Sequence, residues 1–263
     1  MITALDWQTS LPEMKQIFAN GTDSIITSWL DGIMGTAFGD GEHPRCGQIC
    51  LGDFCFFAGD AQAPGAAELV ANPAPDCHGS YIAIGDSEAW NQLIEAQWGE
   101  TARPISRYAM NQPAAFSRAK LERFTGSLPA FMELRQIDSK RYHQVQEQDW
   151  SRDFCSNFPT WKEFQENGLG FVILLDHQVI GGASSYSVCR NGLEIEIGVR
   201  EDFRHQGLGT ICGAKLILAC LERGWTPYWD AANLYSVRLA EKLGYELKGE
   251  YRAYSIPKSG EEK

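Results

Sequence analysis

One stretch of the sequence combines a basic residue, two closely spaced glycines and the start of an apolar helical pattern. It is the turn Arg204–Thr210, which follows the end of a predicted strand at Ile197–Val199. The first amides of a helix have no partner within the helix, and the helix dipole places partial positive charge on them. Glycines leave the backbone accessible to a large anion. The pattern therefore predicts a binding site for a phosphate or pyrophosphate group.

The specificity of this pattern lies in its extended form rather than in the glycines. A Gly-x-Gly pair alone also fits an ordinary helix start in any α/β protein. The dinucleotide-binding spacing GxGxxG and the P-loop spacing GxxxxGK[ST] are both absent from the stretch. What remains is a strand ending at Val199, then Arg204, and then Gly207-x-Gly209 at the helix start.

Two carboxylates on the preceding strand are candidates for acid–base chemistry. Glu194 and Glu196 are separated by one residue, so the strand period of two places both side chains on one face. Attack by an amine needs its deprotonated form, and a nearby carboxylate can take up the proton. Two glutamates on a strand are also typical of a solvated face, and a pair of carboxylates attracts a cationic substrate. The residues alone leave these alternatives open.

The elements that must position these residues are predicted from hydrophobic periodicity and turn residues. In the second half the predicted strands are 132–137, 171–175, 179–187, 193–199, 225–229 and 245–256. The predicted helices of that half are one that Asp138 caps, and 207–223 and 235–243, which end at Gly224 and Gly244. A helical stretch is also predicted over 150–167, interrupted by Pro159. In the first half, strands are predicted over 48–58, 80–85 and 107–110, and helices over 11–30 with a break at Asn20-Gly21, over 61–70 and over 87–98.

Two motifs in this order carry a resemblance to a known family. Arg204-x-x-Gly207-x-Gly209 after Val199 resembles motif A of the GNAT N-acetyltransferase superfamily, and the segment from Asn233 to Tyr245 is similar to motif B. The resemblance covers about 131–256 and is closest to two-domain bacterial GNAT proteins with the motifs in the C-terminal half. It implies an acyl-CoA co-substrate, expected to be acetyl-CoA, held where a mixed sheet splays between two central strands.

The resemblance also implies roles for single residues. Glu194 and Glu196 are the candidate catalytic residues, Glu194 being near the level at which family members often carry a base. The candidate acetyl-CoA-binding residues are Ile197, Gly198, Val199, Arg204, His205, Gln206, Gly207, Leu208, Gly209, Thr210, Asn233 and Ser236. Asn233 also fits a plain helix N-cap.

One position departs from the family pattern. Ala240 stands where many GNAT enzymes have a tyrosine that acts as general acid for the leaving thiolate, and an alanine donates no proton. Water, Tyr235 or Tyr245 could replace it, or the thiolate could leave unassisted. This departure bears on the catalytic mechanism more than on cofactor binding.

The fold class expected is α/β, with an α+β mixed sheet in two parts. Residues 131–256 are expected to form the GNAT domain. Residues 1–125 are expected to form a smaller α/β domain, either a degenerate GNAT-like half or an unrelated α+β cap, because they lack an equivalent of the glycine-containing turn.

Composition excludes several classes of protein. The formal charge of −11, from 23 basic and 34 acidic residues, argues against binding to nucleic acid or to an anionic membrane surface. A cytoplasmic location is expected, because no apolar run is long enough to span a bilayer and the N-terminus lacks the order of a signal peptide. The eight cysteines are then expected to be free thiols, and the spacing of Cys46, Cys50 and Cys55 is not that of a zinc site. No metal is expected.

The expected function is transfer of an acetyl group from acetyl-CoA to a primary amine of a small molecule, by direct attack of the amine. The sequence names no particular amine. The alternative is a CoA-binding sensor or an inactive scaffold, which the alanine at Ala240 favours.

Overall fold

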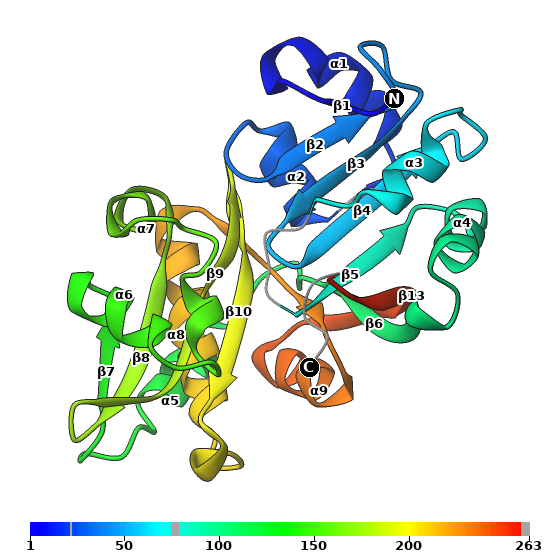
Figure 1. The fold of residues 1–263 in the computed structure, drawn as a ribbon. Coiled ribbons are helices and arrows are strands. Elements are labelled where there is room, and N and C mark those ends of the chain that lie inside the picture. Colours follow the sequence, from blue (N-terminus) through cyan, green and yellow to red (C-terminus); the bar gives the residue numbers. More distant parts are fainter. Residues whose placement is uncertain (22, 75–78, 259–263) are drawn as a thin grey trace. The chain divides into compact units, whose positions relative to one another are not determined.

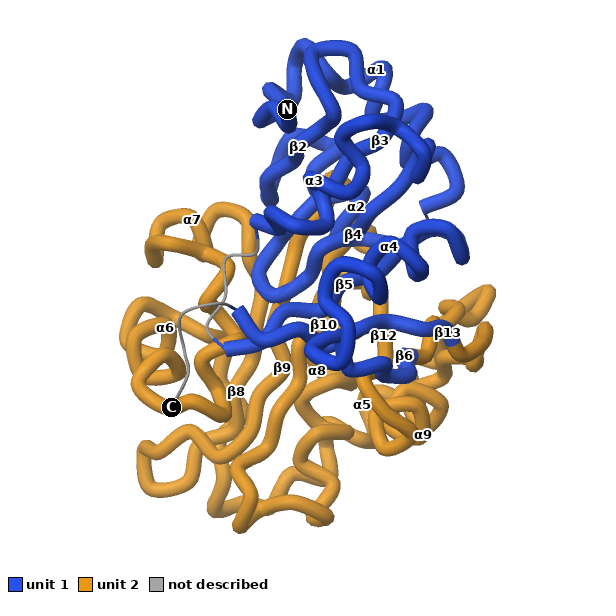
Figure 2. Tube along the Cα trace, turned by 45° about the vertical axis from the view of Figure 1, so that its right-hand side comes forward, with its two compact units in different colours: residues 1–107, 251–263 blue, residues 108–250 orange. Residues whose placement is uncertain are grey.

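The computed structural model describes residues 1–21, 23–74 and 79–258, which form a mixed α/β protein with two sheets. The chain divides into two compact units, residues 1–107 with 251–263 and residues 108–250 (Figure 2). The domain ranges expected from the sequence, 1–125 and 131–256, differ from these units, and that assignment stays a prediction. Within the described ranges, no helix combines the length and apolar content required to cross a bilayer.

Unit 1 builds a sheet in the order β1-β2-β3-β4-β5-β13, in which β4 and β5 run parallel and the pairs β1–β2, β2–β3, β3–β4 and β5–β13 run antiparallel (Figure 1). Two of its strands continue into unit 2: β6 at its C-terminal end and β13 at its N-terminal end. The elements of this unit are β1 (Thr3–Ala4), α1 (Trp7–Ile17), α2 (Ser24–Leu30), β2 (Thr36–Gly39), β3 (Cys46–Leu51), β4 (Phe54–Gly59), α3 (Ala66–Ala71), β5 (Ser80–Gly85), α4 (Glu88–Trp98), the short helix η1 (Gly99–Thr101), β6 (Arg103–Asn111) and β13 (Glu246–Pro257).

The single strand expected over 48–58 is wrong, because the structure has a hairpin there. β3 and β4 pair antiparallel up to Leu51 and Phe54, and the two residues between them form the turn. Gly52 adopts a φ of +57°, the left-handed conformation that such tight turns require. The apolar run was continuous on both sides of this turn, so hydrophobicity alone did not reveal it.

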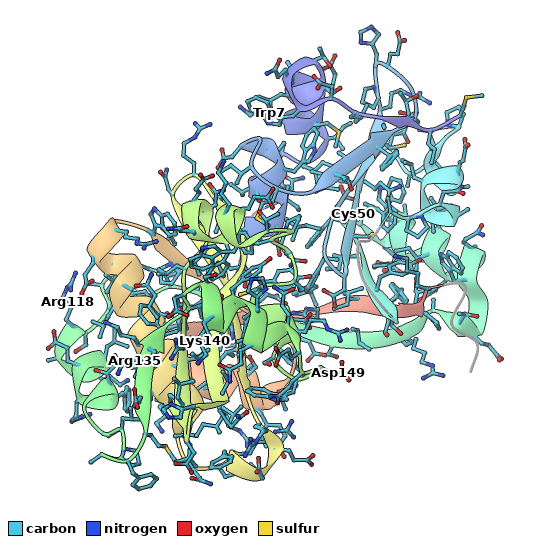
Figure 3. All side chains as sticks on the ribbon, turned by 60° about the vertical axis from the view of Figure 1, so that its left-hand side comes forward. Trp7, Cys50, Arg118, Arg135, Lys140 and Asp149 are labelled. Carbon is cyan, nitrogen blue, oxygen red and sulfur yellow. The ribbon has the colours of Figure 1, made fainter. Side chains whose placement is uncertain are left out.

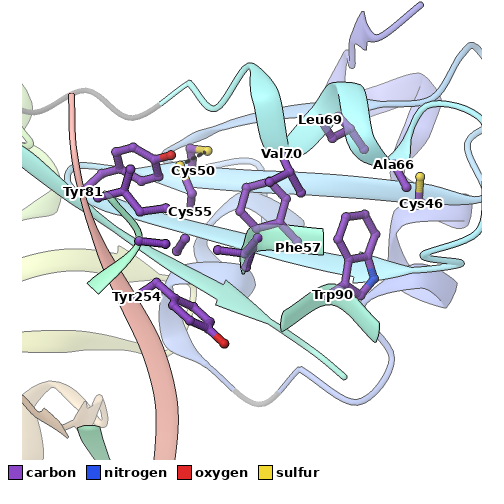
Figure 4. Close-up of a cluster of buried hydrophobic side chains, with 14 of the residues drawn as sticks. Cys46, Cys50, Cys55, Phe57, Ala66, Leu69, Val70, Tyr81, Trp90 and Tyr254 are labelled. Carbon is purple, nitrogen blue, oxygen red and sulfur yellow. Dashed lines mark hydrogen bonds between the residues drawn. The ribbon is translucent and has the colours of Figure 1, made fainter. Parts of the chain in front are cut away.

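The core of unit 1 lies on this hairpin and on α3, α4 and β5 (Figure 4). Phe57 stacks on Trp90 with ring centroids 5.7 Å apart, and the Trp90 indole donates a hydrogen bond to the Gly59 carbonyl. Cys50 and Cys55 face each other across the hairpin with their Sγ atoms 2.6 Å apart. The seven described cysteines are free and buried, as expected for core thiols, and Cys77 lies outside the described residues.

Unit 2 builds a five-stranded sheet in the order β11-β10-β9-β8-β7. All its pairs are antiparallel except β10–β11, and the following strand β12 pairs with β6 instead. The elements of this unit are α5 (Arg118–Thr125), β7 (Glu133–Gln136), α6 (Ser139–Gln146), η2 (Arg152–Phe154), α7 (Trp161–Asn167), β8 (Gly170–Leu175), β9 (Gln178–Cys189), β10 (Gly192–Val199), η3 (Glu201–Phe203), α8 (Leu208–Arg223), β11 (Thr226–Tyr228), β12 (Asp230–Ala231) and α9 (Leu234–Leu243). The strands expected in this half, the helix capped by Asp138 and the helices 207–223 and 235–243 are confirmed within a few residues, and the strand expected over 225–229 is β11. The helical stretch expected over 150–167 is wrong in its first part, where the structure has only the short helix η2 before α7. Helix α5 and strand β12 were not predicted.

Three short elements of unit 2 carry basic residues. Figure 3 labels Arg118 on α5, Arg135 on β7 and Lys140 on α6. Arg135 donates to Glu133 at 2.7 Å on the same strand, an exposed pair that contributes little to stability.

Candidate active site

The N-terminal end of α8 is the centre of the candidate site. Gly207 is its N-cap with a φ of +82°, and no side chain caps this helix end. The helix has a continuous apolar face and ends at Gly224, whose φ of +69° gives the left-handed C-cap expected from the sequence. A long, well-packed helix thus presents its positive dipole end on a turn that only glycine adopts without strain.

The first amides of α8 are available to a ligand. The first backbone bond of this turn joins the Ile211 N–H to the Gly207 carbonyl at 3.2 Å. Within the described ranges, the N–H groups of Leu208, Gly209 and Thr210 have no acceptor. A Cβ built on Gly207 would meet no atom within 4 Å, so the space beside this residue is open. These features fit a bound pyrophosphate, which needs several converging N–H donors and close access to the backbone.

The side chains around the turn are arranged in two ways. Arg204, His205 and Gln206 are exposed, whereas Leu208 and Thr210 are buried. The Arg204 Nε donates to the Val199 carbonyl at 3.4 Å, which holds this cation beside the helix end. The exposed residues can therefore reach a bound anion, while the buried pair packs the helix.

A second arginine near the turn is already paired. Arg200 donates through Nε and Nη2 to both carboxylate oxygens of Asp202, at 2.8 and 2.9 Å. This pairing raises the pKa of Arg200 and lowers the pKa of Asp202. The loop between β10 and α8 thus presents Arg204, rather than Arg200, as its cation nearest the helix end.

The two glycines of the motif differ in their surroundings. A Cβ on Gly209 would lie 3.6 Å from Val199 Cγ2 and 3.6 Å from Leu239 Cδ2, which are ordinary packing distances. The Cβ position of Gly209 therefore faces the protein interior, whereas that of Gly207 faces open space. We assign the close backbone approach predicted from the sequence to Gly207.

Strand β10 has an open edge beside this helix end. Its parallel pairing with β11 stops at Glu194 and Tyr228, while β10 continues to Val199 and pairs on its other side with β9 as far as Gly181. In the part of the chain that the structure describes, residues 195–199 of β10 therefore pair on one side only. This divergence matches the splay that the sequence predicts between two central strands.

Alternation along β10 determines which backbone groups face the open edge. The Asn191 carbonyl accepts the Thr226 N–H of β11 at 2.8 Å, and the Arg200 N–H donates to Ile180 on the β9 side at 3.0 Å. Odd-numbered residues between them therefore direct their N–H and C=O groups to the open edge. Ile197 and Val199 therefore direct backbone groups to this edge, and their pairing with an extended ligand stays a prediction.

Gly198 is placed differently from its two neighbours. Its backbone groups face β9, where it is the partner of Gly182. A Cβ on Gly198 would lie 3.3 Å from Phe154 of η2, so this glycine lets η2 pack closely on the sheet. A contact between Gly198 and the coenzyme stays a prediction. The pairing of Gly198 with β9 does not favour it, because its backbone groups face away from the open edge.

The two candidate catalytic glutamates lie on one face of β10, opposite the face that packs on α8. Ile197 defines the α8 face, since its Cδ1 atom would lie 3.3 Å from a Cβ on Gly213. Glu194 is 7% exposed, and its Oε1 accepts the Asp230 N–H at 2.7 Å. Glu196 is half-buried and lies beyond the end of the β11 pairing. The two carboxylates are therefore in different surroundings despite their spacing.

Helix α9 begins at the second motif. The Asn233 Oδ1 accepts the N–H groups of Tyr235 and Ser236, both at 3.0 Å, so this residue is the N-cap. The Ser236 hydroxyl accepts the Trp229 indole N–H at 3.0 Å. Both predicted coenzyme contacts thus have structural partners already, and their binding roles stay predictions.

The position of Ala240 offers no proton donor. Ala240 is fully buried, and its carbonyl accepts the Gly244 and Tyr245 amides. The Tyr245 hydroxyl donates to the Pro227 carbonyl at 2.9 Å, and burial, together with nearby Cys220 and Glu194, raises the Tyr245 pKa well above its usual value. Tyr235 is 75% exposed at the start of α9. Of the two tyrosines suggested as substitutes, Tyr235 is the one with a hydroxyl that solvent and a ligand can reach.

Two features of the site were not predicted from the sequence. The Asp230 amide, 36 residues from Glu194 along the chain, is the partner of that carboxylate. Ser187 is the cross-strand partner of Glu194, and its buried Oγ has no hydrogen-bond partner among the described residues. No local pattern identifies either one, because both depend on strand register.

No group of three His, Cys, Asp or Glu side chains within the described ranges is arranged to hold a metal ion. The expectation that the protein uses no metal stays a prediction.

Comparison with known proteins places this geometry in a family. The model of the GNAT acetyltransferase family matches residues 15–254. The uncharacterized N-acetyltransferase YdfB of Bacillus subtilis (strain 168) is 30% identical over 164 residues, which are 60% of this chain and 62% of that protein. The match thus spans less than two thirds of the length of this curated relative.

Solved structures extend the likeness to both parts of the chain. A GCN5-related N-acetyltransferase-like protein from Streptococcus suis 89/1591 superposes with a TM-score of 0.87 and 34% identity, over 96% of this chain and 100% of that one. A tandem GNAT protein from the clavulanic acid biosynthesis pathway superposes with a TM-score of 0.59 and 10% identity, over 98% of each chain, which is a likeness of fold. The resemblance inferred from the two motifs is confirmed: the chain belongs to the GNAT acetyltransferase family.

Proposed function

We propose that this protein transfers an acetyl group from acetyl-CoA to a primary amine of a small molecule. Membership of the GNAT family implies an acyl-CoA co-substrate. The observation that supports its binding here is the uncapped N-terminus of α8 beside the open edge of β10. The amides of residues 208–210 and Arg204 hold the pyrophosphate, and the odd-numbered residues of β10 pair with the extended arm.

The chemistry follows from groups at the same edge. N–H groups of β10 that point to the open edge can polarise the thioester carbonyl, which lowers the barrier to attack by the amine. Glu196, half-buried beyond the ladder, is the carboxylate we propose as the acceptor of the amine proton. The thiolate leaves without help from position 240, or with a proton from water or Tyr235.

A second candidate is a CoA-binding sensor or inactive scaffold. Two observations favour this candidate, because neither residue supplies a general acid. Ala240 is buried and has no ionisable group, and the buried Tyr245 hydroxyl already donates to the Pro227 carbonyl. In this candidate the coenzyme binds at the same helix end but no acyl transfer follows.

Calorimetric titration with acetyl-CoA, followed by a thiol-release assay over a broad panel of primary amines, tests both candidates. Binding with thiol release supports the transferase, and binding without release from any amine supports the sensor. Absence of binding at millimolar acetyl-CoA refutes both. Three further points are proposed on sequence grounds alone. The protein is cytoplasmic, and it binds neither nucleic acid nor membrane. Residues 131–256 form the GNAT domain, and residues 1–125 form a degenerate GNAT-like half or an unrelated one.

A further inference from the structure

The parallel ladder between β10 and β11 ends abruptly. The Thr226 N–H donates to the Asn191 carbonyl, and the pairing stops at Glu194 and Tyr228. In a parallel ladder the donors recur every second residue on each strand. The next donor after position 228 is therefore the Asp230 N–H, and the acceptor due opposite it is the Ile195 carbonyl.

The Asp230 N–H is directed to a side chain instead. It donates to Glu194 Oε1 at 2.7 Å, and Asp230 is at the same point the partner of Ala109 on β6. Glu194 is buried, so this is a hydrogen bond between an amide and a carboxylate shielded from water, a strong kind. The carboxylate occupies the place of the backbone acceptor that would have continued the ladder.

The other edge of β10 changes at the same residue. Glu194 is the partner of Ser187, but the next residue, Ile195, is the partner of Ser185, so β9 carries one extra residue, Tyr186, at this point. Such a bulge increases local twist and bends a strand. The bulge lies on β9, so the β9 ladder becomes irregular at the same residue of β10 at which the pairing with β11 ends.

We propose that Glu194 is a positioning residue whose carboxylate terminates the β10–β11 ladder and so keeps the β10 edge open for the acyl-CoA arm. The proposal rests on the proposed function, since it concerns the edge at which the co-substrate pairs. It replaces the predicted role of Glu194 as a base. A base must reach the substrate amine, whereas this carboxylate is bonded to the backbone of Asp230.

Three substitutions separate the two roles. Glu194→Gln keeps an acceptor oxygen at the same reach but has no basicity. Glu194→Asp keeps the charge and basicity but shortens the reach by one methylene, and Glu194→Ala removes both. Glu196→Gln removes a carboxylate on the same face of the strand and is the matched control for the exchange and affinity measurements, in which no change is expected. Because Glu196 is the proposed base, the kcat of this variant is expected to fall and is not used as a control.

The first measurement is hydrogen exchange at the Asp230 amide, which requires no catalytic activity. We expect exchange to be faster by about tenfold or more in Glu194→Ala and Glu194→Asp, and Glu194→Gln to restore protection. The second measurement is acetyl-CoA affinity and steady-state kinetics. We expect the dissociation constant and the acetyl-CoA KM to rise by about tenfold in the Ala and Asp variants, with a smaller change in kcat and with rescue by Gln.

The opposite pattern overturns the proposal. A Gln variant that keeps Asp230 protection and affinity but loses kcat by about a hundredfold, while Asp retains activity, would assign Glu194 as the base. Unchanged exchange and affinity in the Asp variant would equally refute the positioning role, even if the Ala variant does not fold. If the wild-type protein binds no acetyl-CoA, the proposed function fails, while the exchange measurement still decides whether Glu194 ends the ladder.

Discussion

Replacement of Gly207 by alanine is the sharpest test of the helix-end site. Gly207 has a φ of +82°, and its Cβ position meets no atom within 4 Å. The methyl group thus causes no clash in the free protein, and the strain of a left-handed alanine costs about 1–2 kcal/mol of stability. In the complex the same methyl occupies the space through which a phosphate approaches the amides.

The expected loss of binding follows from the hydrogen bonds displaced. A hydrogen bond to a charged group contributes about 1.5–3 kcal/mol, so displacement of the phosphate from one amide raises the acetyl-CoA dissociation constant by roughly 10- to 150-fold. Displacement from two amides would exceed this range. The measurement is calorimetric titration of the variant with acetyl-CoA, with thermal unfolding as the measure of strain.

Gly224 provides a matched control on the same helix. It has a φ of +69°, and its Cβ position also meets no atom within 4 Å. It lies at the C-terminal end of α8, about 26 Å from Gly207 at 1.5 Å per residue. Gly224→Ala therefore carries the same backbone strain without a methyl at the proposed site. If both variants weaken acetyl-CoA binding equally, the effect is one of stability, and the assignment of the helix end as the pyrophosphate site is refuted.

Three further predictions concern the stability of the protein. Asn233→Ala removes the N-cap of α9 and should lower the free energy of unfolding, measured in urea, by about 1 kcal/mol. Asn233→Asp keeps a capping oxygen and should retain most of that stability. Equal losses in the two variants would contradict the capping role. Ala240→Tyr should lower the melting temperature, because Ala240 is fully buried and overpacking costs about 1–3 kcal/mol. We expect no rise in kcat. A variant with a higher kcat would show that the missing general acid limits the reaction. Burial raises the pKa of the Cys46 and Cys220 thiols to about 12. Both raised values are above those of the unfolded chain, so this stabilisation is complete below about pH 9 and is lost towards pH 12, by about 1.4 kcal/mol per pH unit for each thiol. Unfolding free energies at pH 8, 9, 10 and 11 measure the slope, and no decline would contradict the burial of these thiols.

The parts of the fold that sequence predicted well are those that local rules determine. Helix α8 was predicted from apolar spacing and from Gly224, and the end of α1 from Asn20-Gly21 in the helical run. The hairpin of β3 and β4 was missed because Gly52-Asp53 makes a two-residue turn within a continuous apolar run. A single glycine there is a weak signal, since it also fits a bulge in one long strand.

The candidate site shows the same division between local and distant interactions. The turn before α8 is contiguous, so its amides and its cation could be predicted from a motif. The pairing of Glu194 with the Asp230 amide depends on where β11 leaves β10, which no spacing within one strand reveals. The period of two correctly placed Glu194 and Glu196 on one face, but it could not show that one is bonded to the backbone while the other lies beyond the ladder.

The proposed function assigns the acyl donor and the acceptor amine to different kinds of groups, which explains why only the donor could be inferred from the sequence. In the proposed complex, backbone amides of α8 and β10 hold the donor, and the positions of these amides follow from two glycines and one strand end. For the proposed amine we expect recognition by side chains from elements distant in sequence, for which the sequence offers no motif. Substitutions at Gly207 should therefore weaken acetyl-CoA binding by the same factor whichever amine is present. Substitutions that change the KM for one amine and not for another should map to residues outside 195–210. A Gly207 variant that discriminated between amines would show that the donor site and the acceptor site are not separate.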